Sequence, residues 1–145
     1  ILALNKAGIA YEIIPGVSSI FAAMAEAGIP LTRRNESRKV QFLTGHDLNG
    51  NFPNDLMNKS LTDLTTTTVI FMAKKNYSFL LDFLIKEGLA KTTPAIVASS
   101  ITKKNQQIYK TTIEKALKIL STKNVEESPT LIIYGPLNMS LMKDD

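Results

Sequence analysis

Small and polar residues follow four of the apolar segments in this sequence, and these junctions are where chemistry is most readily positioned. They are residues 15–19, 44–46, 72–74 and 98–102. In open α/β sheets, ligands bind just beyond the carboxyl ends of the strands. If the preceding apolar segments are strands, the four junctions predict a small-molecule site at one edge of a sheet.

The first junction, residues 15–19, reads Pro-Gly-Val-Ser-Ser and precedes an apolar helical pattern. A glycine lets the backbone approach a ligand closely, and the start of a helix offers free N–H groups and a positive dipole end. Ser18 and Ser19 add two hydroxyl groups. The alternative is that a serine is simply the N-cap of the helix, and the residues alone favour this simpler interpretation.

His46 and Met72 stand at two further junctions. His46 is the only histidine, and it follows an expected strand end, where a general base can sit. No serine or cysteine nucleophile adjoins it, so its neighbours favour a hydrogen-bonded loop residue. Met72 ends an apolar segment, where methionine usually fills a core. Its position at the ligand edge is the local reason to consider a ligand contact.

Three arginines, Arg33, Arg34 and Arg38, form a compact basic cluster between two expected elements. The planar guanidinium group suits carboxylates, but a solvated loop explains the cluster equally well. No Walker loop and no G-x-G-x-x-G stretch is present, so no nucleotide motif applies. The residues alone therefore do not name a reaction.

Composition predicts an ordinary globular domain. The chain has 145 residues, of which 44% are apolar, and a net charge of +4, which fits one domain with a real core. The absence of cysteine and the single histidine exclude a thiolate or multi-histidine metal site. Basic residues form no long run, so we expect no nucleic-acid partner. Apolar runs are too short to span a bilayer and no charged leader opens the chain, so we expect a cytoplasmic protein.

Positioning the four junctions requires strands that alternate with helices, and the apolar patterns predict this arrangement. We expect strands at residues 11–14, 39–43, 67–73, 94–98 and 130–134, and a short edge strand at 107–110. Helical spacing predicts one helix from Ser18 or Ser19 to Gly28, one from a cap at Asn76 to Gly88, and one over 113–120. This alternation is typical of an α/β layered domain. Residues 102–112 lack a helical pattern, so we expect one antiparallel pair near the end.

The first residues carry apolar side chains with no cap before them, and Gly8 is a helix stop. We therefore expect the last turns of a helix there, in a piece of a longer protein.

Five segments resemble, in order and with similar spacing, the motifs of the tetrapyrrole methylase family. Residues 7–19 read Ala-Gly-Ile-Ala-Tyr-Glu-Ile-Ile-Pro-Gly-Val-Ser-Ser, residues 27–34 read Ala-Gly-Ile-Pro-Leu-Thr-Arg-Arg, and residues 44–46 read Thr-Gly-His. Residues 67–73 and 129–135 resemble two strand motifs of the family. The Ile-Pro-Leu-Thr and Thr-Gly-His pieces look most like the uroporphyrinogen-III C-methyltransferases of this family.

The resemblance implies an α/β fold with a mixed sheet flanked by helices, which is the C-terminal domain of the tetrapyrrole methylase fold. Residues 1–14 are then the end of an N-terminal domain whose rest is missing, and residues 15–145 are the C-terminal domain. It also implies a homodimeric enzyme that binds S-adenosyl-L-methionine between its domains and releases S-adenosyl-L-homocysteine. Its product is precorrin-2, made from the tetrapyrrole uroporphyrinogen III for sirohaem or cobalamin synthesis.

The resemblance assigns the cofactor to five positions that match the family's contacts: Ser18, Ser19, Met72, Ile101 and Thr130. Arg33 and Arg34, helped by Arg38, would meet substrate carboxylates through paired hydrogen bonds. The chain departs from the family pattern in three places, with Arg33 for histidine, Ala73 for glycine and Ile101 for alanine or glycine.

The glycine-aspartate loops and acid/base residues that the family carries in its N-terminal half are absent from this sequence. We therefore assign no catalytic residue and expect the chain alone to be inactive. Two alternatives remain open at this point. One is another methylase of the superfamily, acting on a precorrin, diphthine or ribosomal RNA, and the other is a non-catalytic binding or dimerisation module.

Overall fold

The computed structural model describes residues 1–138, apart from the side chain of residue 126. The described structure is built around a single mixed sheet. Its strands are β1 (Lys39–Thr44), β2 (Thr66–Phe71), β3 (Pro94–Ser99), β4 (Gln107–Thr112) and β5 (Thr130–Tyr134). Their spatial order is β1-β2-β5-β3-β4. β1 and β2 run parallel, whereas β5 is antiparallel to both β2 and β3, and β4 is antiparallel to β3. The expected α/β fold with a mixed sheet is confirmed, including the antiparallel edge strand β4.

The helices are α1 (Leu2–Lys6), α2 (Ser19–Ala27), α3 (Tyr77–Lys86), α4 (Ile113–Leu120) and the short α5 (Lys123–Glu126). Within residues 1–138, three 3₁₀ turns lie in the connections, namely η1 (Asn54–Leu56), η2 (Lys59–Thr62) and η3 (Lys74–Asn76). The sequence patterns predict α2, α3 and α4 but not α5 or the 3₁₀ turns, which are too short to carry a period. None of the described helices is long and apolar enough to cross a membrane.

Two cores cover the two faces of the sheet, because successive side chains of a strand point to opposite sides. On one face, Val69, Ile96 and Ile133 pack against Ile20 and Met24 of α2. On the other face, the neighbouring strand residues pack against α3 and α4, through Ile70, Val97, Ile132, Tyr77, Leu80, Leu84, Ile113 and Leu120. The central strands are buried on both sides, so they appear in the sequence as runs of β-branched and apolar residues.

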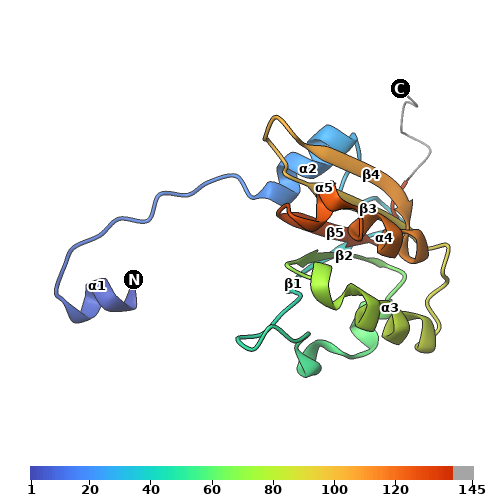
Figure 1. Cartoon of the computed structure of the whole chain (residues 1–145), viewed down its shortest axis with the longest axis horizontal. Coiled ribbons are helices and arrows are strands. Elements are labelled where there is room, and N and C mark those ends of the chain that lie inside the picture. The colour runs from blue at the N-terminus through green and yellow to red at the C-terminus, as the bar shows by residue number, and fades with distance from the viewer. Residues whose placement is uncertain (139–145) are drawn as a thin grey trace.

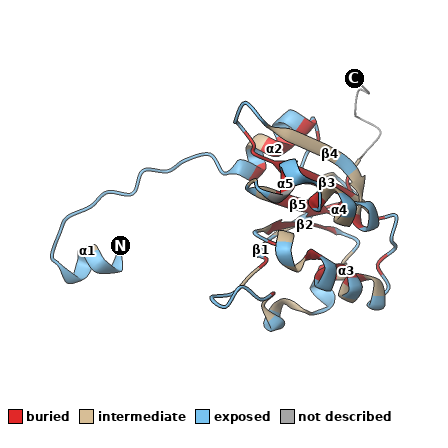
Figure 2. Ribbon diagram, in the orientation of Figure 1, coloured by how far each residue is buried: buried red, intermediate tan, exposed pale blue. Residues whose placement is uncertain are grey.

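Residues 1–18 form an arm that projects from the body and carries α1 at its far end (Figure 1). No residue of the arm is buried (Figure 2). The predicted helix end is confirmed, with α1 followed by Gly8 at φ 66°. The strand predicted at residues 11–14 is wrong, because that segment has no strand partner among the described residues to complete its backbone hydrogen bonds.

Candidate functional site

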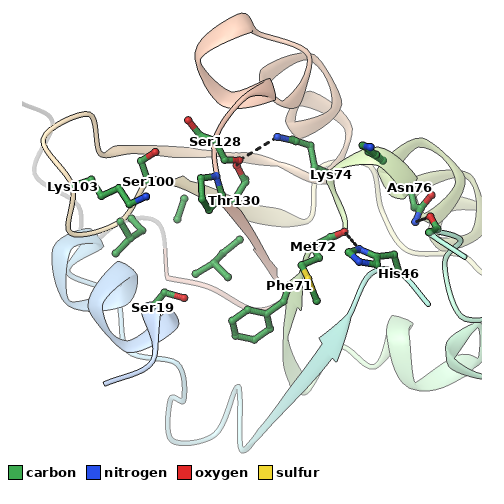
Figure 3. Close-up of a pocket in the computed structure, with 16 residues that line it drawn as sticks. Ser19, His46, Phe71, Met72, Lys74, Asn76, Ser100, Lys103, Ser128 and Thr130 are labelled. Carbon is green, nitrogen blue, oxygen red and sulfur yellow. Dashed lines mark hydrogen bonds between the residues drawn. The ribbon is translucent and has the colours of Figure 1, made fainter. Parts of the chain in front are cut away.

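A cavity of about 450 Å³ opens at the edge of the sheet where β2 and β3 end and β5 begins (Figure 3). β2 and β3 run in the same direction because each is antiparallel to β5, so their carboxyl ends share this edge. The wall is apolar around Phe71, Ala98, Ile101 and Leu131. Its polar lining includes Ser19, Ser100, Thr130, His46, Asn76, Lys74, Lys75 and Lys103.

Met72 forms one lip of the cavity in an unusual backbone conformation. Its φ is 56°, which lies in the left-handed region, and its side chain is 54% exposed. Residues with a Cβ disfavour this region for steric reasons. The turn explains why β2 ends at Phe71 and not at Ala73 as predicted.

The loop after β1 packs tightly against this turn. The Gly45 N–H donates to the carbonyl of Phe71 at 2.6 Å, and Nδ1 of His46 lies 3.2 Å from the carbonyl oxygen of Met72. Because a carbonyl oxygen only accepts, Nδ1 carries the proton in this contact. The side chain of Asn76 donates to the carbonyls of Gly45, at 2.8 Å, and of Gly50, at 3.0 Å.

The opposite wall is a second left-handed turn, formed by the residues on either side of Ile101. Ser100 has φ 50° and Thr102 has φ 68°. The Ser100 N–H donates to the carbonyl of Pro129 at 2.9 Å, and the Thr102 N–H donates to Oε1 of Gln106 at 2.7 Å. Strained turns of this kind persist where surrounding contacts hold them, and they cluster at ligand sites.

Lys74 joins the end of β2 to the start of β5. Its Nζ donates to the carbonyls of Val125, at 3.0 Å, and Ser128, at 3.1 Å. These carbonyls lie within and just after α5, where a cation complements the negative end of the helix. Lys74 therefore holds the segment that leads into Thr130 against the cavity.

The structure brings four of the five predicted cofactor positions to this cavity, namely Ser19, Met72, Ile101 and Thr130. Ser18 occupies the N-cap position of α2, makes no side-chain cap hydrogen bond, and is not part of the lining. His46, for which the sequence favoured a simple loop role, does line the cavity and is hydrogen-bonded as that role predicts.

The arginine cluster lies at the other end of the sheet. Arg33 forms a β-bridge with Ser37 and an ion pair with Glu36, and the Arg38 N–H donates to Thr65 just before β2. Arg34 is exposed in the same turn. With a rise of about 3.3 Å per residue, β1 separates this cluster from the cavity by roughly 15–20 Å. None of the three arginines lines the cavity.

Asn76 is a lining residue that sequence reasoning did not place at the site, whereas Lys74 lies in the predicted junction 72–74 but was given no role there. Asn76 does hold the N-cap position of α3, as predicted, but its side chain makes no cap hydrogen bond there. It points back to the loop after β1 instead (Figure 3). A capping asparagine and a long-range donor have the same local sequence pattern, so only the fold distinguishes them.

The clearest pKa shifts occur outside the cavity. The Lys39 ammonium, followed by the donors of Thr65 and Thr66, holds the pKa of Asp63 well below its usual range. Burial raises the pKa of Tyr77 and of Tyr134. The residues that the structure describes contain no group of three or more histidines, cysteines or acids that could hold a metal ion. The apolar wall and the polar side chains of the cavity suit an organic ligand, bound by shape and hydrogen bonds.

The family model of the Tetrapyrrole (Corrin/Porphyrin) Methylases matches residues 1–117. The chain is 34% identical to the siroheme synthase of Pseudomonas fluorescens (strain SBW25) over 128 residues, covering 88% of this chain and 27% of that protein. It is also 34% identical to the siroheme synthase of Chromobacterium violaceum over 135 residues, covering 93% of this chain and 28% of that protein. The chain spans about a quarter of the length of these relatives.

The solved structures that match the fold include two methyltransferases. A cobalt precorrin-4 methyltransferase superposes with a TM-score of 0.79 and 25% identity, over 92% of this chain and 55% of that chain. The uroporphyrin-III C-methyltransferase of Thermus thermophilus, solved with S-adenosyl homocysteine, gives a TM-score of 0.72 at 21% identity, over 92% and 56% of the two chains. At that identity the second likeness bears on the fold alone.

Proposed function

The chain belongs to the tetrapyrrole methylase family, and from this premise we propose that it forms the C-terminal domain of a uroporphyrinogen-III C-methyltransferase. The enzyme would use S-adenosylmethionine, and its product would be precorrin-2. The observation that carries the proposal is the cavity lined by Ser19, Met72, Ile101 and Thr130. Four positions that resemble the family's cofactor contacts come from four separate segments and surround one space.

The cavity fits the cofactor in size and chemistry. Its volume of about 450 Å³ falls within the range of roughly 300–1,000 Å³ for small-molecule sites. Apolar side chains such as Phe71 and Leu131 suit a flat adenine ring, and Ser100 and Thr130 offer polar groups beside it. Lys75 and Lys103 at the margin suit the carboxylate of the amino-acid part.

We expect this domain to contribute to methyl transfer by positioning the cofactor. When bound, S-adenosylmethionine supplies an electrophilic methyl group on sulfur. The residues of this chain would hold the cofactor in one orientation, with Met72 at the exposed lip and Ile101 and Thr130 on the opposite wall. Orienting two reactants accelerates transfer without a protein nucleophile, which agrees with the lack of an assigned catalytic acid or base.

Arg33 and Arg34 remain candidates for the substrate carboxylates, but only at the far end of β1. A substrate that met them while reacting at the cavity would have to extend along the sheet edge. Replacing both with alanine should raise the KM for the tetrapyrrole and leave the affinity for S-adenosylhomocysteine unchanged, if this assignment is right.

The proposal is tested by calorimetry with S-adenosylhomocysteine and by methyl transfer from labelled cofactor to uroporphyrinogen III. Each is measured on the chain alone and with the N-terminal domain of the Thermus thermophilus relative added as a separate polypeptide. We expect no turnover by the chain alone, because the family's glycine-aspartate loops are not in it. Absence of cofactor binding under both conditions would refute the proposal.

A second candidate is methylation of a later intermediate, a precorrin. The TM-score of 0.79 to a cobalt precorrin-4 methyltransferase favours it. The same assay with a precorrin in place of uroporphyrinogen III separates the two substrates, since the cofactor site is common to both.

A further inference from the structure

Met72 presents its side chain at the cavity lip only because its backbone is held in the left-handed region. Relaxation of φ from 56° to the common negative range would redirect the side chain and the course of the chain towards Lys74. Such a conformation is disfavoured for any residue other than glycine. Some contact must therefore hold it in place.

Both peptide groups that flank the Met72 Cα are held by the loop after β1. The carbonyl before that Cα, of Phe71, accepts from the Gly45 N–H at 2.6 Å. The carbonyl after it, of Met72 itself, accepts from Nδ1 of His46 at 3.2 Å. Fixing the planes on both sides of one Cα fixes its φ and ψ, because these are the only soft torsions between the two planes.

Asn76 in turn holds the loop after β1 in place. It stands four residues after Met72, and its amide group donates to the carbonyls of Gly45 and Gly50, at 2.8 and 3.0 Å. These bonds hold the loop that in turn holds Met72. Figure 3 shows the His46 ring directed at the Met72 carbonyl, with Asn76 on the side away from the cavity centre.

We propose that His46 and Asn76 are positioning residues that keep Met72 in its left-handed conformation and thereby shape the cavity lip for the cofactor. This role rests on the proposed function for its effect on binding, but not for its effect on the Met72 backbone. The hydrogen bonds of His46 and Asn76 go to backbone carbonyls of this chain. The two act through Met72, and Gly45 provides the close contact between the two loops.

The first experiment measures the backbone of Met72 directly by NMR. A left-handed residue gives a strong NOE between its own amide proton and Hα, because φ above zero brings these protons together. We expect this NOE to weaken in Asn76→Ala and in His46→Phe, which keeps a ring but removes the donor. Asn58→Ala is the matched control, because Asn58 also makes loop hydrogen bonds, to Ser60 and Asp55, but at η2 and outside the cavity lining.

The second experiment measures affinity for S-adenosylhomocysteine on the same variants, with the N-terminal domain of the Thermus thermophilus relative present. We expect a loss of about 5- to 20-fold in Asn76→Ala and His46→Phe, the scale of one or two oriented hydrogen bonds, and less than about twofold in Asn58→Ala. His46→Asn, which retains a donor, should recover part of the loss.

The outcomes separate this inference from the proposed function. An unchanged Met72 NOE in both Asn76→Ala and His46→Phe overturns the positioning role, whether or not the cofactor binds. A weakened NOE in a protein that does not bind S-adenosylhomocysteine supports the positioning role and refutes the function.

A double-mutant cycle keeps the test valid if a single variant unfolds easily. Glycine adopts positive φ freely. In a Met72→Gly chain the left-handed conformation at position 72 is therefore not strained, and the hydrogen bonds of Asn76 are less needed to maintain it. The loss of unfolding free energy caused by Asn76→Ala should therefore be smaller in that background than in the parent. Strict additivity of the two substitutions would contradict the inference.

Discussion

Gly45 lies so close to Ala73 that a Cβ placed on the glycine would be 2.2 Å from the Cα of Ala73. The two residues follow β1 and β2, which are parallel neighbours. Their contact is therefore the point where the loops beyond two strand ends meet. It also explains why the Gly45 N–H and the His46 side chain, both in the loop after β1, can reach the left-handed turn at Met72.

Replacement of Gly45 by alanine should destabilise the domain and disturb the site. The three nearest atoms are the backbone Cα and N of Ala73 and its Cβ, which is fixed to that backbone, so they cannot move aside as the end of a flexible side chain would. We expect a loss of about 1–3 kcal/mol in unfolding free energy, the usual range for overpacking, measured by urea unfolding. Gly16→Ala is the matched control, since its added Cβ meets nothing within 4 Å. Equal stability of the two variants would show that the loops are not in tight contact.

Met72→Ala should weaken binding of S-adenosylhomocysteine more than it lowers stability. The side chain is 54% exposed, so its removal leaves little of a cavity in the core. Met24→Ala provides the contrast, because Met24 is 4% exposed in the core under α2. We expect Met24→Ala to cost about 2–5 kcal/mol of stability with a smaller effect on affinity. Calorimetry measures the affinity for S-adenosylhomocysteine and urea unfolding measures the stability of both variants. Unchanged affinity in Met72→Ala would show that Met72 is not part of the site.

The sequence predicts most of the fold because the central strands carry runs of β-branched and apolar residues and the longer helices carry clear periods. It does not predict where β5 lies in the sheet, since the position of β5 between β2 and β3 depends on packing of both faces at once. At the site, the end of an apolar strand and the family resemblance both predict Met72 as a ligand contact. The bond from Asn76 to Gly45 spans 31 residues and depends on the pairing of β1 with β2, so no local pattern reveals it.

Asp63 should contribute to stability above about pH 4 and lose that contribution in acid. Lys39 donates to its carboxylate at 2.5 Å, and Thr65 and Thr66 add further hydrogen bonds. These partners favour the charged form, so the pKa of Asp63 is lower in the folded chain than in the unfolded one. As the pH falls below about 4, the unfolded chain takes up the proton first, and the stabilisation declines towards the folded-state pKa.

Urea unfolding of Asp63→Asn tests this pH dependence. At pH 7 we expect a loss of roughly 1 kcal/mol, reduced from the usual value for charged hydrogen bonds because the site is partly exposed to solvent. The difference between the variant and the parent should shrink as the pH is lowered from about 4. Asp82→Asn, at an exposed position of α3, is the control. A difference that stays constant with pH would contradict the assigned pKa shift.

Self-association of the chain is the last prediction, and it follows from the arm. Ile14 and Val17 are 82% and 83% exposed on a segment without strand partners in the described structure, and Ile13 beside them is 68% exposed. Apolar side chains gathered in this way mark a surface that another chain covers. We expect sedimentation equilibrium to detect dimers or larger species whose share grows with concentration.

Ile14→Asp with Val17→Asp should shift the chain to monomer without lowering its stability, because neither side chain packs in the core. Leu48→Asp, at a fully exposed loop position, tests whether added charge alone has this effect. A parent chain that stays monomeric at high concentration, or a Leu48→Asp variant that dissociates equally well, would rule out the arm as the associating surface.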